Sequence, residues 1–315
     1  MLTRPDPDVL IAGPLGQWLT GQNGMRDAAK AKAAKIQKVT IVAASVVAFL
    51  IVLLSPWGVG RALQFGFFIG AGGFGWAALS KRAAISTIKG GMNDAIAHAL
   101  DMRYSLIVNP GGEFELAKTF GMVPTFERSN FEDLWVGTVG VHSFQVYEAK
   151  LEVERSNGKS SYWETVFDGS VSTIGFARRF NAVTLVERAG QRMRLFGLLG
   201  EKDLISLGGI ELGKVEMVDP RFGEEFAVWS NDQVEARYLV HPAYVEKLMA
   251  VEAAFAGEEI RCLFNGGQLI IVLESGNLFE SGSLDASQDR GLLAKTIDQF
   301  GTLVDLAAEL NERAR

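Results

Sequence analysis

Five polar residues close together in the sequence have the types and spacing that acid–base chemistry would need. They are Asp232, Glu235, Arg237, Tyr238 and His241. Residues three or four apart share one face of a helix, so Asp232 lies beside Glu235 and Arg237 beside His241. His241 could then act as a general base with an acidic partner.

A structural interpretation explains the same five residues with fewer assumptions. Acidic side chains in a first helical turn are favoured by the helix dipole, Arg237 would pair with an acid or a carbonyl, and His241 would end the helix. We favour this interpretation, assign no catalytic residue and keep the five as a candidate functional surface. Glu132 and Asp133, in "NFEDLWVG", are interpreted in the same way.

Other chemical signals are weak. The one cysteine, Cys262, excludes an intrachain disulfide and a cysteine-rich metal site, and the three histidines have no ligand spacing. Neither H-E-x-x-H nor G-x-S-x-G occurs. We therefore predict no metal and no cofactor, and an enzyme is less expected than a non-enzymatic protein.

Two glycine motifs have the letters of nucleotide-binding loops. Residues 70–75, "GAGGFG", match G-x-G-x-x-G. A dinucleotide site also needs an acidic residue at the end of a strand about 20 residues further on. Asp94 is at that distance, but the sequence around it has a helical pattern. Residues 208–215, "GGIELGKV", match a P-loop until Val215, where a Ser or Thr would bind Mg²⁺. Neither motif predicts a cofactor.

The first glycine motif lies instead in an apolar block. Residues 39–54 and 62–79 are uncharged, and a helix of roughly 17–25 apolar residues crosses a bilayer. With the short connection between them, these segments predict a transmembrane helical hairpin over 38–80. Small residues let helices approach closely in lipid, so we expect packing at the following glycines: Gly66, Gly70, Gly72 and Gly73.

The charge distribution predicts the orientation of this hairpin. Residues 1–38 hold six basic residues (Lys or Arg) and three acidic residues (Asp or Glu). Residues 39–82 hold three basic and no acidic residues, and the remainder of the chain holds 22 basic and 34 acidic residues. Basic residues flank the outer ends of both spans, which places both termini in the cytoplasm. We expect a multi-pass protein of the bacterial inner membrane, in contact with lipids, without a signal peptide, and with no nucleic-acid partner for its acidic body.

The remaining sequence predicts an α+β domain. We divide the chain into a basic cytoplasmic tail (1–37), the hairpin (38–80), a juxtamembrane helix (81–105), weakened at Gly90-Gly91, a mainly antiparallel α+β domain (106–286) and a C-terminal helix (287–315). Residues 1–24 are expected to be loosely ordered. Tight turns are expected at "SNGK" (156–159) and "FNGGQL" (264–269).

A pair of helices is expected in the middle of this domain. Ser230 and Gln233 suggest a capping box for the first, and Pro242 begins the second, which stops near Gly257. In the C-terminal helix, an apolar stripe at spacings of three and four predicts packing on the sheet. The stripe consists of Leu293, Ile297, Phe300, Val304 and Ala307.

The stretch "DPRFGEEFAVWSNDQVEARYLVHPAYVEKL" (219–248) resembles a family of uncharacterised bacterial membrane proteins, the DUF3137 family. An aromatic strand, D-Q-V-E-A-R-Y-L and a helix begun by proline carry the resemblance, which extends over about 35–310. The sequence departs from the pattern at His241, where Thr is expected. The family implies no activity, and a LemA-type membrane protein is a partner that the resemblance suggests.

These observations favour a non-enzymatic inner-membrane protein that presents an acidic cytoplasmic α+β domain to a protein partner. Two alternatives remain: a membrane-tethered enzyme that uses the helix from Asp232 to His241, and a module that senses a lipid or small ligand.

Overall fold

The computed structural model describes residues 4–54, 58–139, 142–176, 179–190, 203–217 and 220–313. The chain forms two compact units. The helical unit contains Asp6–Ala95 and Ser281–Ala294, and the sheet unit contains Met1–Pro5, Ile96–Glu280 and Lys295–Arg315.

The helical unit begins with two short helices, α1 (Pro7–Ala12) and α2 (Pro14–Gly21). The expectation of a loosely ordered segment over 1–24 was therefore wrong for these residues. Each helix has its proline in the first turn, where the missing N–H would have had no helical partner. The Asp6 side chain caps α1 by accepting a hydrogen bond from the backbone N–H of Asp8 at 2.8 Å.

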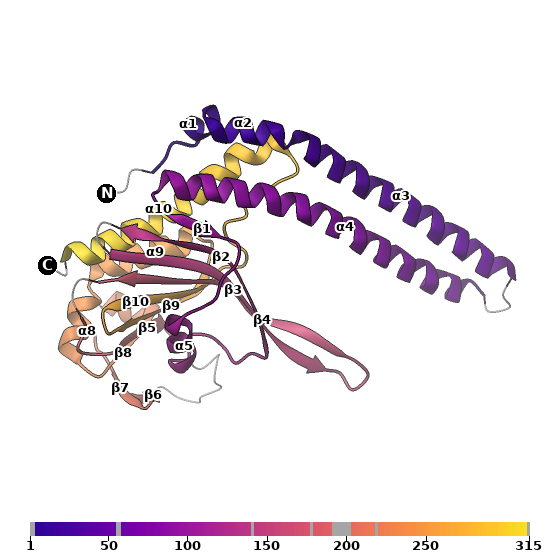
Figure 1. Ribbon diagram of the computed structural model, residues 1–315. Helices are drawn as coiled ribbons and strands as arrows, with labels where there is room; N and C mark the ends of the chain where they lie inside the picture. The colour runs from indigo at the N-terminus through magenta and orange to yellow at the C-terminus, as the bar shows by residue number, and fades with distance from the viewer. Residues whose placement is uncertain are drawn as a thin grey trace. The chain divides into compact units, whose positions relative to one another are not determined.

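Two long helices follow, α3 (Asn23–Leu54) and α4 (Gly58–Ala99), which run side by side in opposite directions (Figure 1). The second apolar segment and most of the expected juxtamembrane helix form the single helix α4, so the boundary near residue 81 is not a break. α4 continues through Gly90-Gly91, where the sequence predicted a weakening. A Cβ at Gly91 would lie 2.2 Å from the Trp18 ring of α2. The glycine provides room for that ring.

The glycines of residues 70–75 lie inside α4, so "GAGGFG" forms no phosphate-binding turn. Gly73 is packed against α3, because a Cβ there would lie 2.0 Å from Thr40 Oγ1. Among the described residues, nothing lies within 4 Å of a Cβ at Gly72, so the expected contact of Gly72 with the first span is not found. Gly66 and Gly70 belong to α4, but their surroundings lie outside the described structure.

The sheet unit is built on one ten-stranded sheet in the order β1-β2-β3-β4-β10-β9-β5-β8-β7-β6. Each neighbouring pair in this order is antiparallel. The strands are β1 (Arg103–Ser105), β2 (Arg128–Val139), β3 (His142–Ser156), β4 (Ser161–Gly175), β5 (Thr184–Arg188), β6 (Leu204–Leu207), β7 (Ile210–Lys214), β8 (Phe226–Ser230), β9 (Glu258–Asn265) and β10 (Gln268–Glu274). The mixed fold with a large antiparallel sheet agrees with the sequence prediction.

Helices cover both faces of this sheet. The helices that follow α4 in the chain are α5 (Gly112–Thr119), α7 (Pro220–Glu225), α8 (Gln233–Leu239), α9 (Pro242–Ala254) and α10 (Asp289–Arg313), which the short helix η1 (Ala286–Gln288) precedes. Phe144 and Tyr147 of β3 point to opposite faces, because side chains alternate along a strand. Phe144 contacts Phe300 of α10, and Tyr147 lies under Phe131, which contacts Phe114 of α5.

The apolar stripe of the C-terminal helix is buried, from Leu293 to Ala307, as predicted. Both expected turns are present: Gly158 and Gly266 have positive φ angles of 81° and 65° at the hairpins β3–β4 and β9–β10. The P-loop-like letters at 208–215 include Gly208 and Gly209, which make the turn between β6 and β7. That motif is therefore a hairpin and not a phosphate site.

Candidate functional site

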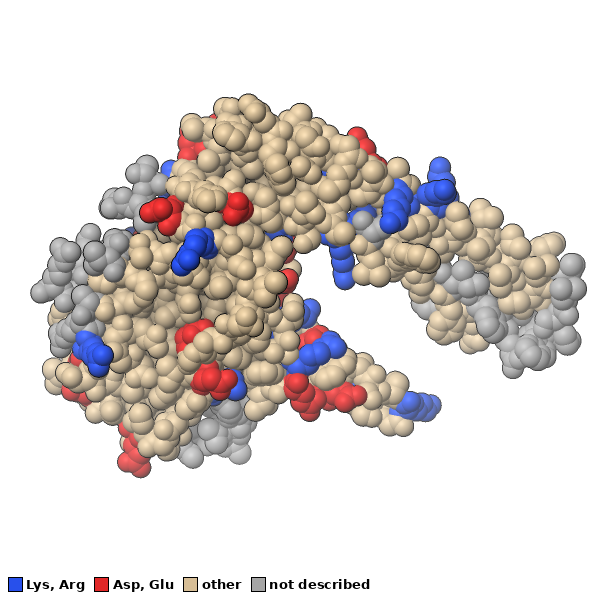
Figure 2. Space-filling model, in the orientation of Figure 1, with Lys and Arg blue, Asp and Glu red and all other residues tan. Residues whose placement is uncertain are grey.

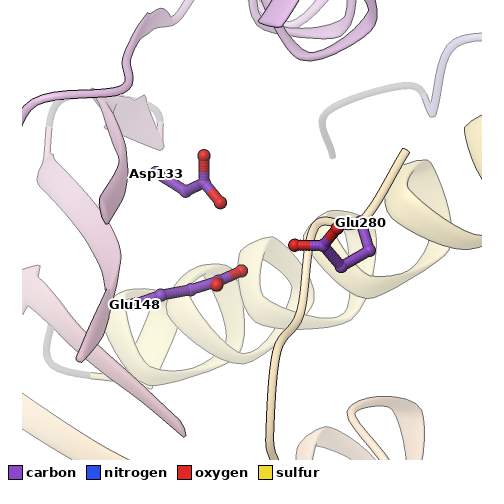
Figure 3. Close-up of side chains that lie close together, drawn as sticks. All are labelled: Asp133, Glu148 and Glu280. Atoms are coloured by element: carbon purple, nitrogen blue, oxygen red, sulfur yellow. The ribbon is translucent and has the colours of Figure 1, made fainter. Parts of the chain in front are cut away.

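Three carboxylates from separate parts of the sheet unit converge on one point (Figure 3). Asp133 belongs to β2, Glu148 to β3, and Glu280 follows β10. One oxygen atom from each lies within 4.8 Å of the others. Asp133 and Glu148 are 0% and 3% exposed, and Glu280 lies nearer the surface.

A β-bulge directs Asp133 into this carboxylate cluster. The pairing of β2 with β3 shifts between Glu132 and Trp135, and Asp133 within the bulge has a φ angle of 58°. Such a bulge reorients a side chain relative to the regular pleat. The hydroxyl of Tyr104 in β1 donates a hydrogen bond of 2.5 Å to Asp133 Oδ1, and the Tyr104 ring packs on Trp135 at 5.0 Å.

The chemistry of the cluster follows from charge and burial. Like charges at short distance in a poorly solvated place are unfavourable, so carboxylates there either retain a proton or share a cation. Carboxylate oxygens are the ligands that hard divalent cations such as Ca²⁺ and Mg²⁺ prefer. Asp133, Glu148 and Glu280 are therefore the residues that could hold such a metal ion in the described part of the chain.

Sequence reasoning did not find this cluster. On sequence alone, Asp133 is predicted to have a structural role, and no pattern predicts a role for Glu148 or Glu280. The sequence did contain one signal for a buried Glu148. In a strand, Phe144, Val146 and Glu148 point to the same face of the sheet, and the first two are apolar. A glutamate that continues an inward-facing apolar row is a candidate for a buried charge.

The residues from Asp232 to His241 have structural roles around α8. Asp232 is the N-cap, and its Oδ1 accepts from the backbone N–H groups of Val234 and Glu235 at 2.8 and 3.1 Å. The Glu235 carboxylate accepts from the backbone N–H groups of Asn181 and Ala182, at 3.0 and 2.6 Å. These bonds tie α8 to the segment before β5.

The remaining members of the candidate surface point to other partners. Arg237 Nε donates to the carbonyl of Glu216 at 3.0 Å, and its Nη2 donates to Gln233 at 2.8 Å. His241 is the N-cap of α9, where its Nδ1 accepts from the N–H of Tyr244 at 3.2 Å. The ring of Tyr238 is half exposed. These bonds do not bring the five side chains together as an acid–base pair would require, and their role as a functional surface stays a prediction.

The capping box expected at Ser230 is not formed, because the N-cap of this helix is Asp232, two residues later. Ser230 ends β8, and its Oγ accepts from the N–H of Asp232 at 3.1 Å. Gln233 does not close a box, because its Nε2 donates to the carbonyl of Lys214 at 2.9 Å. The expected division at His241 and Pro242 was correct, since α8 ends at Leu239 and α9 begins at Pro242.

An open pocket of about 400 Å³ lies at one end of the sheet. Its lining is rich in glutamate, and Arg188 bonds to two of them, Glu225 and Glu252. Partial burial opposes the charge of Arg188, but the bonds to Glu252 and then Glu225 raise its pKa above the ordinary value. The guanidinium is therefore a permanent cation among acids. The lining residues are Arg188, Ala189, Glu224, Glu225, Glu252, Gly257, Glu258 and Glu259.

These features define a mainly antiparallel α+β protein that also has a long-helix unit. Residues 165–312 match the family model DUF3137, described as a protein of unknown function, which confirms the resemblance over this range. The expected extension of the resemblance to residue 35 lies outside the match. The matched range contains Glu280 and the helix from Asp232 to His241, but not Asp133 or Glu148.

No curated protein matches the chain. Among solved structures, the chain is similar to the crystal structure of the mycobacterial trehalose monomycolate transport factor A, TtfA. The two are 13% identical, the similarity covers 69% of this chain and 93% of that chain, and the TM-score is 0.34. At this TM-score the similarity supports no inference about function.

Proposed function

We propose that α3 and α4 anchor the chain in the bacterial inner membrane and that the sheet unit serves as a cytoplasmic domain that binds a protein partner. The observation that carries the proposal is the exposed apolar surface of α3. The helical stretch Pro14–Ile51 is long and apolar enough to cross a membrane, and 6% of its most apolar part is buried. A core helix of a water-soluble domain would be mostly buried, so a lipid environment accounts for this surface.

The exposed side chains occupy both long helices. On α3, Val39, Val42 and Phe49 are 61–65% exposed, and on α4, Phe68 and Trp76 are 71% and 68% exposed. At a rise of 1.5 Å per residue, the uncharged stretches 39–54 and 62–79 extend about 24 and 27 Å, close to a hydrocarbon core of about 30 Å. Among the described residues, only the stretch that contains most of α3 is long and apolar enough to cross a membrane, so the proposed second span rests on the length of the uncharged part of α4 and on its exposed side chains.

The basic side chains support the orientation. Lys35 and Lys38 precede the apolar part of α3, and Lys81 and Arg82 follow that of α4. Because the helices are antiparallel, these residues lie at the same end of the two apolar stretches. In Figure 2, Lys and Arg gather part-way along this helical arm, and the described surface beyond them is uncharged. The positive-inside rule then favours cytoplasmic termini.

Reporter fusions test the topology. A fusion at residue 58 should report the periplasm, and one at residue 315 should report the cytoplasm. A periplasmic signal from residue 315 would overturn the orientation, and recovery of the full chain in the soluble fraction would overturn the anchor.

Two observations favour partner binding over catalysis. The body of the chain after residue 82 is acidic, and the polar residues of α8 that an enzyme would need have structural roles. A LemA-type membrane protein is the first candidate to test. Cross-linking in membranes followed by mass spectrometry should recover one protein reproducibly, and recovery of none would count against the proposal. The enzyme alternative has less support, because His241 Nδ1 and the Glu235 carboxylate already accept backbone hydrogen bonds.

A further inference from the structure

An open, apolar groove of about 520 Å³ runs along one side of α3. The side chains that line it form two rows with a spacing of four residues, and such rows are parallel ridges on a helix with a groove between them. One lining residue is charged, and it lies at the end of the groove nearest the start of α3. The lining residues are Lys38, Val39, Val42, Ala43, Val46 and Val47.

The groove is about as long as one leaflet of a membrane is deep. From Lys38 to Val47 the helix advances about 14 Å at 1.5 Å per residue, and half of a hydrocarbon core of about 30 Å is about 15 Å. Val42 and Val46 in the groove are 63% and 50% exposed. An acyl chain of one leaflet that begins at Lys38 therefore matches the groove in length and in polarity.

Trp76 of α4 indicates that Lys38 lies at the depth of the lipid head groups. Gly73 of α4 packs on Thr40 of α3, and the two helices run in opposite directions (Figure 1). Trp76 lies three residues beyond Gly73, so it is about level with residue 37. Its side chain is 68% exposed, and exposed tryptophans are enriched at the boundary between membrane and water.

The charge at this end of the groove is positive and not balanced by the chain itself. Residues 28–93 contain eight basic residues and no acidic residue. Lys35 and Lys38 are exposed, and in the described part of the chain neither forms an ion pair. Lys30 differs from them, because its ammonium lies 3.8 Å from the carboxylate of Asp27. The end of the groove thus favours an anionic group from outside the chain.

We propose that α3 binds an anionic phospholipid of the cytoplasmic leaflet, with the phosphate at Lys38 and one acyl chain in the groove. The proposal rests on membrane anchoring by α3 and names the class of lipid that the anchor selects. Clusters of basic residues beside a membrane helix attract anionic lipids, and the groove adds a place for the chain of one such lipid.

The lining favours a lipid over a helix of another protein as the occupant. Helices that approach closely in a membrane do so at small residues, as α4 does at Gly73. The apolar lining instead consists of four valines and one alanine. A neighbouring helix would also need an acidic residue opposite Lys38, whereas a lipid phosphate already lies at that depth.

Native mass spectrometry of the full chain in an uncharged detergent tests the contact with the head group. Phosphatidylglycerol and phosphatidylcholine with identical acyl chains are added in separate samples, and the wild type should retain the anionic lipid at least fivefold better. Lys38→Gln should lower this ratio about fivefold, which is roughly what one lysine near the head groups contributes. Lys30→Gln is the matched control on the same helix and should keep the ratio, because Lys30 is already paired with Asp27.

A second pair of variants tests the groove. Ala43→Trp fills it without a change of charge and should reduce the retention of both phospholipids. Ala31→Trp, at an exposed position of α3 outside the groove, should leave retention unchanged. Equal helix content of the two variants in circular dichroism excludes misfolding as the cause. Glycerol phosphate, which has the phosphate but no acyl chain, should not be retained.

Several outcomes would overturn the lipid site. They are equal retention of the two phospholipids by the wild type, equal loss in Lys38→Gln and Lys30→Gln, unchanged retention in Ala43→Trp, retention of glycerol phosphate, and a bound protein in place of the lipid. Failure of the membrane anchor gives a different result, because the chain would then be recovered in the soluble fraction without detergent. A chain that needs detergent and shows no lipid preference refutes the lipid site alone.

Discussion

Gly73 of α4 lies directly against Thr40 of α3, with 2.0 Å between a Cβ placed on the glycine and Thr40 Oγ1. Thr40 is 8% exposed in a stretch whose other side chains are largely exposed. The glycine is therefore what lets the two long helices approach at this level, as small residues do in membrane helix pairs.

Gly73→Leu should push the helices apart and lower the stability of the pair by about 1–3 kcal/mol, the usual cost of overpacking. Thermal stability of the detergent-extracted chain and its level in the membrane measure this effect. Gly72→Leu is the matched control, because no described residue lies within 4 Å of a Cβ there. Equal loss in both variants would show that the contact with Thr40 is not the cause.

Arg26 and Asp289 form a buried ion pair in the helical unit. Arg26 Nη2 lies 2.8 Å from Asp289 Oδ1, and the side chains are 1% and 9% exposed. Arg26→Met leaves a buried carboxylate without its cation, which costs about 3–5 kcal/mol. Faster amide exchange in the first turns of α10 should report the loss. Arg26→Met with Asp289→Leu should recover most of the protection, and a double variant no better than the single one would contradict this assignment.

The long helices and the antiparallel α+β unit were predictable because their signals are local. Uncharged runs, alternating strands and the turns at Gly158 and Gly266 need no distant residue. α1 and α2 were missed because prolines suggested disorder, although Pro7 and Pro14 lie where a helix begins. The pairing of β4 with β10 joins residues about a hundred positions apart, and alternation contains no information on such partners.

Glu235 connects α8 to the segment before β5 through two backbone N–H groups. Glu235→Ala leaves these donors without their acceptor and should lower the free energy of unfolding by about 2–3 kcal/mol. Denaturant unfolding followed by tryptophan fluorescence measures the change. Val234→Ala is the control on the same helix, since Val234 is 77% exposed. If Glu235→Gln has the stability of the wild type but abolishes the cellular phenotype of the protein, the enzyme alternative would be favoured instead.

The carboxylate cluster was not predictable for a related reason. Asp133, Glu148 and Glu280 are up to 147 positions apart, and a bulge that no short motif announces turns Asp133 towards the other two. Sequence reasoning preferred α8 because its polar residues are close in the chain. That closeness reflects helix capping, with Asp232 and His241 as the two N-caps.

Glu274, at the end of β10, predicts a pH dependence of stability. Burial raises its pKa above the ordinary value of 4.5, Arg261 opposes this, and the neighbouring acids, led by Glu259, add to it. The folded chain then binds more protons than the unfolded chain above pH 4.5, so this residue makes stability fall as pH rises through its raised pKa. Unfolding measured from pH 4.5 to 7 should show a steeper loss in the wild type than in Glu274→Gln. Parallel curves would refute the raised pKa.

Glu148 gives the decisive test of the carboxylate cluster. One oxygen of Glu148 lies within 4.8 Å of one oxygen each of Asp133 and Glu280, so the three acids repel one another whenever they are ionised together without a cation. Glu148→Gln removes one charge at nearly constant shape, and in EDTA it should raise the midpoint of thermal unfolding by about 2–4 °C, which corresponds to about 1 kcal/mol in a domain of this size. Glu154→Gln, exposed on the same strand, should leave the midpoint unchanged. The opposite result would be that EDTA lowers the unfolding midpoint of the wild type, that added Ca²⁺ or Mg²⁺ restores this midpoint, and that the midpoint of Glu148→Gln changes with neither EDTA nor cation. In that case the repulsion argument fails and the cluster is a cation site. The two explanations predict opposite signs for one substitution, because a ligand stabilises the folded state that binds it whereas repulsion between neighbouring like charges destabilises that state.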